Sequence, residues 1–105
     1  MNRVTIQYFD ECAHWKLADG RVQQVLRDLS RTDVKVEHQR IESPEQAART
    51  GFHGSPTILV DGRDPFATGA EPVGMICRIY LTNEGRQGAP TESQLRRVFA
   101  RDLKT

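Results

Sequence analysis

The chain has 105 residues, which is enough for one domain around a single core. Its 15 basic and 14 acidic residues are mixed along the sequence, so the net charge of +1 gives no support for a nucleic-acid-binding or membrane-binding surface. Residues 1–3 lead directly into a strand-like segment, and no apolar stretch approaches membrane-spanning length, so we expect a cytoplasmic protein. Two cysteines far apart in such a chain predict free thiols rather than a structural disulfide.

The first half of the chain alternates between strand and helix patterns. Residues 4–9 alternate and are rich in β-forming side chains, which predicts a strand. Apolar residues at helical spacing then predict an amphipathic helix over residues 14–29, although Gly20 within it costs about 1 kcal/mol relative to alanine. Residues 34–39 alternate again and predict a second strand, parallel to the first. Residues 43–51 combine a capping serine, an early proline and a final glycine, which predicts a short second helix.

The second half is organised around a short buried strand. The run Ile58-Leu59-Val60 is bounded by turn residues and follows Pro56, which has no N–H to give to a β-ladder. We expect this strand to be the centre of the sheet. Residues 75–81 predict a fourth strand, and a capping box that begins at Thr91 predicts a final helix. The expected fold is therefore α/β, a four-stranded mixed sheet with three helices in the order βαβ-α-ββα, as one domain over residues 1–105.

Two features of the sequence resemble the thioredoxin superfamily. Cys12 follows the first strand where the first helix begins, and Ser55-Pro56-Thr57 stands where that superfamily places a cis-proline before its third strand. The resemblance covers nearly the whole chain as topology. It implies a thioredoxin-like fold with a cis Ser55–Pro56 bond. More narrowly, the chain is similar to small bacterial thioredoxin-like proteins of unassigned role.

The motif departs from the family pattern at one position. Family members that exchange dithiols have Cys-x-x-Cys at this turn, whereas this chain has Cys12-Ala13-His14-Trp15. Trp15 holds the place of the resolving cysteine, so a dithiol mechanism is not available within this motif. The sequence therefore predicts a monothiol thiol–disulfide oxidoreductase without a cofactor. An external small thiol, such as glutathione or mycothiol, would resolve its mixed disulfide.

The candidate site gathers around Cys12. A helix N-terminus favours the thiolate, and a protonated His14 would add to that effect, whereas Asp10 and Glu11 oppose it. The loop at the proline would offer backbone groups to an extended substrate, so we expect a protein or a low-molecular-weight thiol or disulfide as the partner. The sequence thus predicts three catalytic and three substrate-binding residues: Cys12, His14 and Pro56, and Trp15, Ser55 and Thr57. As a substrate-binding residue Trp15 would cover the thiol as a lid, but it begins the apolar stripe of the helix, which favours core packing.

Cys77, the second cysteine, lies in the predicted fourth strand. It shares a face with Met75 and Ile79, which predicts a buried core cysteine. If the third and fourth strands pair as a hairpin, Cys77 lies well over 7 Å from the turn that carries Cys12, so no bridge between them is expected. The connection over residues 63–74 is long enough to allow a register shift that would shorten this separation.

A second function class stays open beside the oxidoreductase. The chain could be a non-catalytic thioredoxin-fold module that binds a protein partner or a soft metal, with Cys12 kept for packing. For a metal, Cys12 with His14 or Cys77 is a thin ligand set, because zinc takes four ligands, and no metal site is predicted. His53, three residues before Pro56, could lie beside the active-site turn, although a loop histidine is more often solvated. We also expect Phe66 to anchor the long connection.

Overall fold

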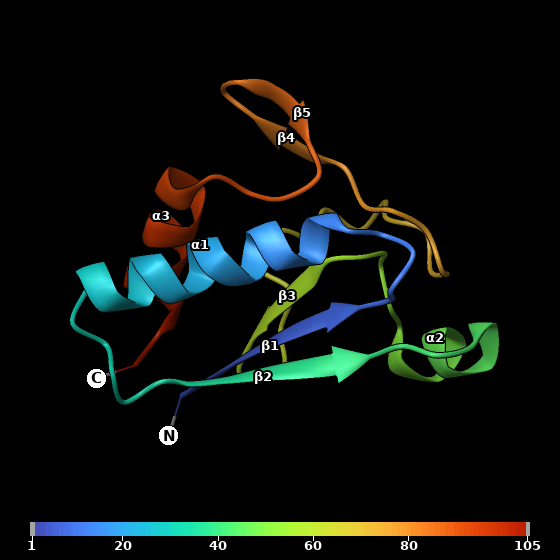
Figure 1. Ribbon diagram of the computed structural model, residues 1–105, viewed down its shortest axis with the longest axis horizontal. Coiled ribbons are helices and arrows are strands. Elements are labelled where there is room, and N and C mark those ends of the chain that lie inside the picture. Colours follow the sequence, from blue (N-terminus) through green and yellow to red (C-terminus); the bar gives the residue numbers. More distant parts are fainter. Residues whose placement is uncertain (1, 105) are drawn as a thin grey trace.

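The computed structural model describes residues 2–104, which form three helices and five strands (Figure 1). The elements in chain order are β1 (Arg3–Tyr8), α1 (His14–Asp28), β2 (Lys35–Arg40), α2 (Pro44–Thr50), β3 (Thr57–Val60), β4 (Tyr80–Thr82), β5 (Gly85–Gln87) and α3 (Glu92–Asp102). No helix within the described residues combines the length and the apolar composition needed to cross a membrane.

β1 is the central strand of a three-stranded sheet in the order β2-β1-β3. It pairs with β2 in parallel and with β3 antiparallel, so that Ile6 lies opposite both His38 and Ile58. The predicted parallel pair joined by a helix is confirmed. The expectation that residues 58–60 form the centre of the sheet is wrong, because β3 is an edge strand of this sheet and β1 is its centre.

Two apolar clusters hold these elements together. The larger lies between the sheet and the neighbouring helices α1 and α3, which Figure 1 shows across one face of the sheet. The smaller connects the turn after β1 to α2. Its buried members are Phe9, Cys12, Ile41, Ala47 and Phe52. The predicted nucleophile is therefore part of a packed apolar cluster.

Residues 75–81 do not form the predicted fourth strand of the sheet. Within this segment, Cys77 makes an isolated parallel bridge to Ser55. β4 then pairs with β5 in a separate hairpin that projects away from the sheet (Figure 1). The structure is thus a small α/β fold with a three-stranded and a two-stranded sheet, and the predicted four-stranded mixed sheet is wrong.

The predicted strand is wrong because residues 75–81 turn toward the core the side chains that we expected to face solvent. Arg78 and Tyr80 are buried, whereas Cys77 and Ile79 are exposed. A one-residue shift moves every side chain of an extended segment to the other face. Here the polar pair turns inward because both side chains find buried partners, and the apolar pair faces solvent.

The helix termini follow the sequence more closely. The Ser43 hydroxyl accepts a hydrogen bond from the Gln46 amide at 3.1 Å at the start of α2, and Gly51 ends that helix with φ of 68°. Thr91 and Gln94 form the predicted capping box of α3. α1 runs through Gly20 as predicted but begins without a side-chain cap.

Two glycine-to-alanine changes should have opposite effects on stability. Gly20 lies inside α1, and a Cβ there would meet nothing within 4 Å, so Gly20→Ala should raise the free energy of unfolding by about 1 kcal/mol. Gly51 has equally open space but φ of +68°, so Gly51→Ala should lower it by about 1 kcal/mol. Urea unfolding of the oxidised protein measures both. If both substitutions changed the free energy of unfolding in the same direction, the explanation from backbone conformation would be contradicted.

Candidate functional site

Cys12 and Cys77 form a disulfide bond, with their Cα atoms 5.9 Å apart. The predicted pair of free thiols is therefore wrong, and so are the expected separation of the two residues and the burial of Cys77 in the core. The cause is the register of the long connection. Cys77 lies beside Ser55 at the Pro56 end of β3, not at its far end.

Backbone hydrogen bonds fix this register. The Ser55 amide donates to the Ile76 carbonyl at 2.8 Å, and the Ser55 carbonyl accepts from the Arg78 amide at 2.9 Å. The two backbones come so close that a Cβ at Gly54, where φ is +107°, would lie 3.0 Å from the Ile76 carbonyl oxygen. The backbone groups that we expected to be offered to a substrate at Ser55 are thus engaged by the chain itself.

The two bonded cysteines have very different surroundings. Cys12 is 2% exposed and belongs to the apolar cluster with Phe9 and Phe52. Cys77 is exposed and lines a pocket of about 510 Å³. Exposed apolar residues line the same pocket: Ile76, Ile79 and Leu81. The bridge therefore joins a residue inside the apolar cluster to a residue at the surface.

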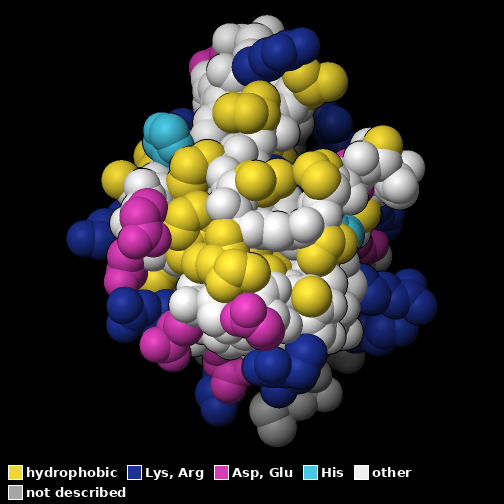
Figure 2. Space-filling model, turned by 90° about the vertical axis from the view of Figure 1, so that its right-hand side faces the viewer, with side chains coloured by type: hydrophobic (Ala, Val, Ile, Leu, Met, Phe, Trp, Pro, Cys, Tyr) yellow, Lys and Arg dark blue, Asp and Glu magenta, His cyan; other side chains and the backbone are white. Residues whose placement is uncertain are grey.

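A space-filling view shows the surface at one end of the molecule (Figure 2). Figure 2 faces the end of the molecule where, in Figure 1, the turn between β1 and α1 and the connection between β3 and β4 lie. Hydrophobic side chains gather across the middle of this face, with charged side chains around them (Figure 2). Four of the five large hydrophobic side chains exposed within residues 2–104 lie within four positions of Cys77 in the sequence: Val73, Ile76, Ile79 and Leu81.

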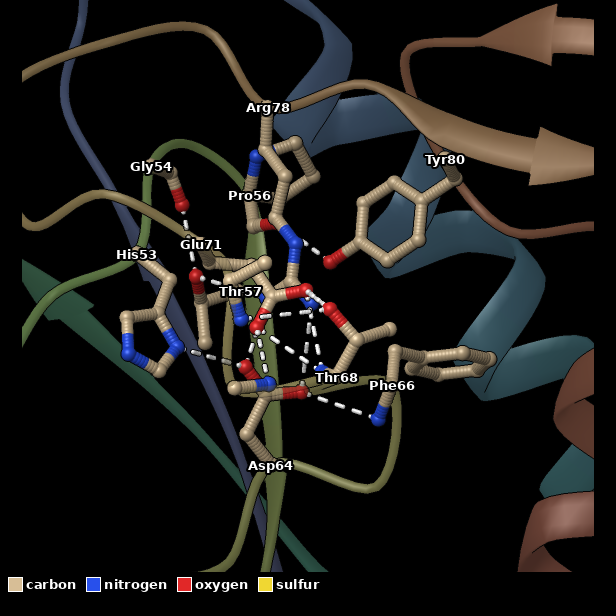
Figure 3. A network of polar contacts seen from close by, with 12 residues as sticks. His53, Gly54, Pro56, Thr57, Asp64, Phe66, Thr68, Glu71, Arg78 and Tyr80 are labelled. Carbon is tan, nitrogen blue, oxygen red and sulfur yellow. Dashed lines mark hydrogen bonds and ion pairs between the residues drawn. The ribbon is translucent and has the colours of Figure 1, made fainter.

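A buried ion pair holds the segment that carries Cys77. The Arg78 guanidinium lies 2.6 Å from the Asp64 carboxylate, with both side chains less than 10% exposed. It also donates to the Thr57 hydroxyl at 3.3 Å, so it ties the connection to the first residue of β3. Figure 3 shows Arg78 extending past Pro56 and Tyr80 toward Asp64. These contacts hold Arg78, the residue after Cys77, against the start of β3.

Tyr80 and His53 complete the network. The Tyr80 hydroxyl donates to the Pro56 carbonyl at 2.6 Å. Burial raises the pKa of this hydroxyl above its ordinary value, so the group stays protonated and able to donate. His53 Nδ1 lies 3.1 Å from the Asp64 carboxylate, so this histidine is a partly buried member of the network rather than a solvated loop residue.

Four of the six predicted site residues lie close together. Cys12 is joined through Cys77 to Ser55, the Ser55–Pro56 bond is cis as predicted, and Thr57 contacts Arg78. The Ser55 hydroxyl also accepts from the Phe9 amide at 3.3 Å, which connects this turn to the end of β1.

His14 and Trp15 pack elsewhere. A side chain at Gly88 would overlap the imidazole of His14, so His14 lies against the backbone that follows β5. Trp15 is half-buried and stacks on Tyr8, with ring centroids 4.0 Å apart, and its edge meets His38. This contact favours the packing role for Trp15 over contact with a substrate.

Sequence reasoning missed three residues that shape the site: Asp64, Arg78 and Tyr80. The sequence does alternate over residues 77–80, but the inner positions belong to Arg78 and Tyr80 and not to their apolar neighbours. A buried arginine needs a charged partner, so the sequence signal for this arrangement is the carboxylate of Asp64 in the long loop before Arg78. Phe66 packs against the larger core cluster and meets the Tyr80 ring edge-on, which confirms its expected anchoring role.

Comparison with known proteins adds no family or relative to this description. No protein-family model matches the chain. No curated protein matches it either.

Removal of one partner of the buried ion pair should be costly. Asp64→Asn keeps the acceptor for the Phe66 amide but leaves the Arg78 charge unpaired, so the free energy of unfolding should fall by about 3 kcal/mol. The matched exposed pair is Arg96 with Asp28, at 2.7 Å, where Asp28→Asn should cost less than about 1 kcal/mol. Urea unfolding at constant redox state gives both values. If Asp64→Asn combined with Arg78→Met is no more stable than Asp64→Asn alone, the unpaired charge is not the cause.

The loop that forms one wall of the pocket should loosen in acid. The Glu71 carboxylate accepts from the Thr68 hydroxyl at 2.6 Å and from the Thr68 amide, and these bonds lower its pKa from 4.5 to about 2. Since the folded pKa lies below the unfolded one, this contribution to stability is present above about pH 4.5 and is lost as the pH falls toward 2. Carboxyl NMR titration should give a midpoint near 2 that rises in Thr68→Val. An unchanged midpoint in that variant would contradict the assignment.

Proposed function

We propose that this chain is a thiol–disulfide redox protein whose working pair is Cys12 and Cys77. The observation that carries the proposal is the disulfide itself, which bonds a buried cysteine to an exposed one at the edge of a pocket. Disulfides that are accessible to other thiols are the ones that undergo exchange, whereas sealed structural bridges resist it. The bridge therefore supports a pair that cycles between disulfide and dithiol.

The pair replaces the monothiol scheme that the sequence predicts. In that scheme an external small thiol resolves the mixed disulfide because Trp15 stands at the resolving position. Cys77, which pairs with Ser55, supplies an internal resolving partner. The resemblance to the thioredoxin superfamily at Cys12 and Pro56 remains part of this proposal. It is supported by the location of Cys12 between β1 and α1 and by that of Pro56, which stands directly before β3 and next to the bridge.

The reaction transfers two electrons. Two external thiols lose two electrons and two protons as they join in a disulfide, and the protein bridge gains them as two thiols. The external thiol belongs to a protein or to a small molecule such as glutathione or mycothiol. We keep the expected cytoplasmic location as part of the proposal, because disulfides in that compartment are catalytic or redox-sensing rather than structural.

The surrounding frame supports repeated cycling. The contacts of Ser55 with Ile76 and Arg78, and the ion pair of Arg78 with Asp64, do not involve sulfur. They persist when the bridge is reduced and keep the two thiols close to each other. Bridge closure is then an intramolecular step with a high effective concentration.

A redox titration tests the proposal. The oxidised protein is equilibrated in buffers of defined glutathione ratio, the free thiols are alkylated, and the fraction of bridged protein is measured by mass. We expect one two-electron transition between about −270 and −180 mV, the range of exchanging dithiols. Cys12→Ser and Cys77→Ser should each abolish it.

A bridge that stays closed below about −300 mV would behave as a structural disulfide and would contradict the proposal. That result would favour the alternative of a non-catalytic binding module.

A further inference from the structure

We infer that Cys77 is the sulfur that external thiols attack and that Cys12 is the sulfur that leaves. This inference rests on the proposed function and assigns roles within it. It reverses the role expected from the sequence, in which Cys12 is the nucleophile that meets the substrate. The reversal follows from the geometry of the bridge.

Access decides which sulfur is attacked. A thiolate must approach a disulfide sulfur from the side opposite the bond that breaks, because the new and the breaking bonds lie in line. Cys77 is exposed and lines the pocket, so an external thiol can approach it from solvent. For Cys12 the approach would have to pass through the apolar cluster that buries it to 2% exposure, where Phe9 and Phe52 pack. A nucleophile therefore reaches Cys77 and not Cys12.

The leaving sulfur is the one better placed to carry negative charge. Cys12 lies two residues before α1, whose first turn has no side-chain cap and no acidic residue, so the positive end of the helix dipole can stabilise a thiolate there. Of the two carboxylates that precede it, Asp10 is paired with Arg40 at 2.6 Å and Glu11 is exposed to solvent. A sulfur whose thiolate is stabilised leaves faster.

The exchange then runs in two balanced steps. An external thiolate bonds to the Cys77 sulfur, the bond from Cys77 to Cys12 breaks, and its electron pair stays on Cys12 as a thiolate. A second external thiolate attacks the external sulfur of the mixed disulfide, which releases the external disulfide and leaves Cys77 as a thiolate. In the opposite direction the Cys12 thiolate attacks the Cys77 sulfur of a mixed disulfide, closes the bridge and releases the external thiol.

Trapping the first intermediate in the wild-type protein tests the assignment. Oxidised protein is mixed with excess reduced glutathione, quenched after increasing times with N-ethylmaleimide, digested and mapped by mass spectrometry. At the shortest times we expect glutathione on Cys77 and maleimide on Cys12, in at least about tenfold excess over the reverse pattern. The reverse pattern, or an equal mixture, would overturn the inference and leave the proposed function intact. If no reduction occurs, the proposed function itself fails.

Single-cysteine variants give a second readout that does not depend on capturing an intermediate. The Cys12→Ser variant retains the exposed thiol, and the Cys77→Ser variant retains the buried one. With oxidised glutathione, the Cys12→Ser variant should form its adduct at least about tenfold faster than the Cys77→Ser variant. Circular dichroism checks that both are folded, and unfolding both in urea should bring the two rates together. A faster Cys77→Ser variant would contradict the assignment.

Discussion

The pairing of Ser55 with the chain at Ile76 and Arg78 is the constraint on which the rest of the structure depends. Two backbone hydrogen bonds, at 2.8 and 2.9 Å, dock a long connection onto the turn before β3. They set Cys77 against Cys12, turn Arg78 and Tyr80 inward, and release β4 and β5 as a separate hairpin. A different register at this one residue would remove the bridge, the buried ion pair and the pocket together.

Arg78 is the side chain that makes this register specific. A buried charge is unfavourable unless a partner offsets its lost hydration, and Asp64 is in place at 2.6 Å only in this arrangement. The guanidinium carbon also lies 4.6 Å from the centroid of the Tyr80 ring, and the Tyr80 hydroxyl is bound to the Pro56 carbonyl. A one-residue shift would turn Arg78 and Tyr80 outward and would leave the buried Asp64 carboxylate without its guanidinium partner. We therefore infer that this network selects one register of the connection more than it raises the free energy of unfolding.

Local signals explain why part of the structure was predictable. The caps at Ser43 and Thr91 and the cis-proline at Pro56 each depend on residues close together in the sequence, and each was predicted correctly. The location of residues 75–81 depends on Asp64, which lies more than ten positions away, so alternation alone could not choose between the two faces. Our assumption that apolar Ile79 would face inward decided the choice wrongly, and the error carried over to Cys77.

The bridge also changes how force would pass through the molecule. Cys12 and Cys77 are 65 positions apart, and α1, β2, α2 and β3 all lie between them. Tension applied to the two ends of the oxidised chain would pass from β1 through the sulfur–sulfur bond to β4, and would bypass those four elements. Reduction would add roughly 220 Å of extensible chain. The redox state of one bond would thus set how far this small domain stretches.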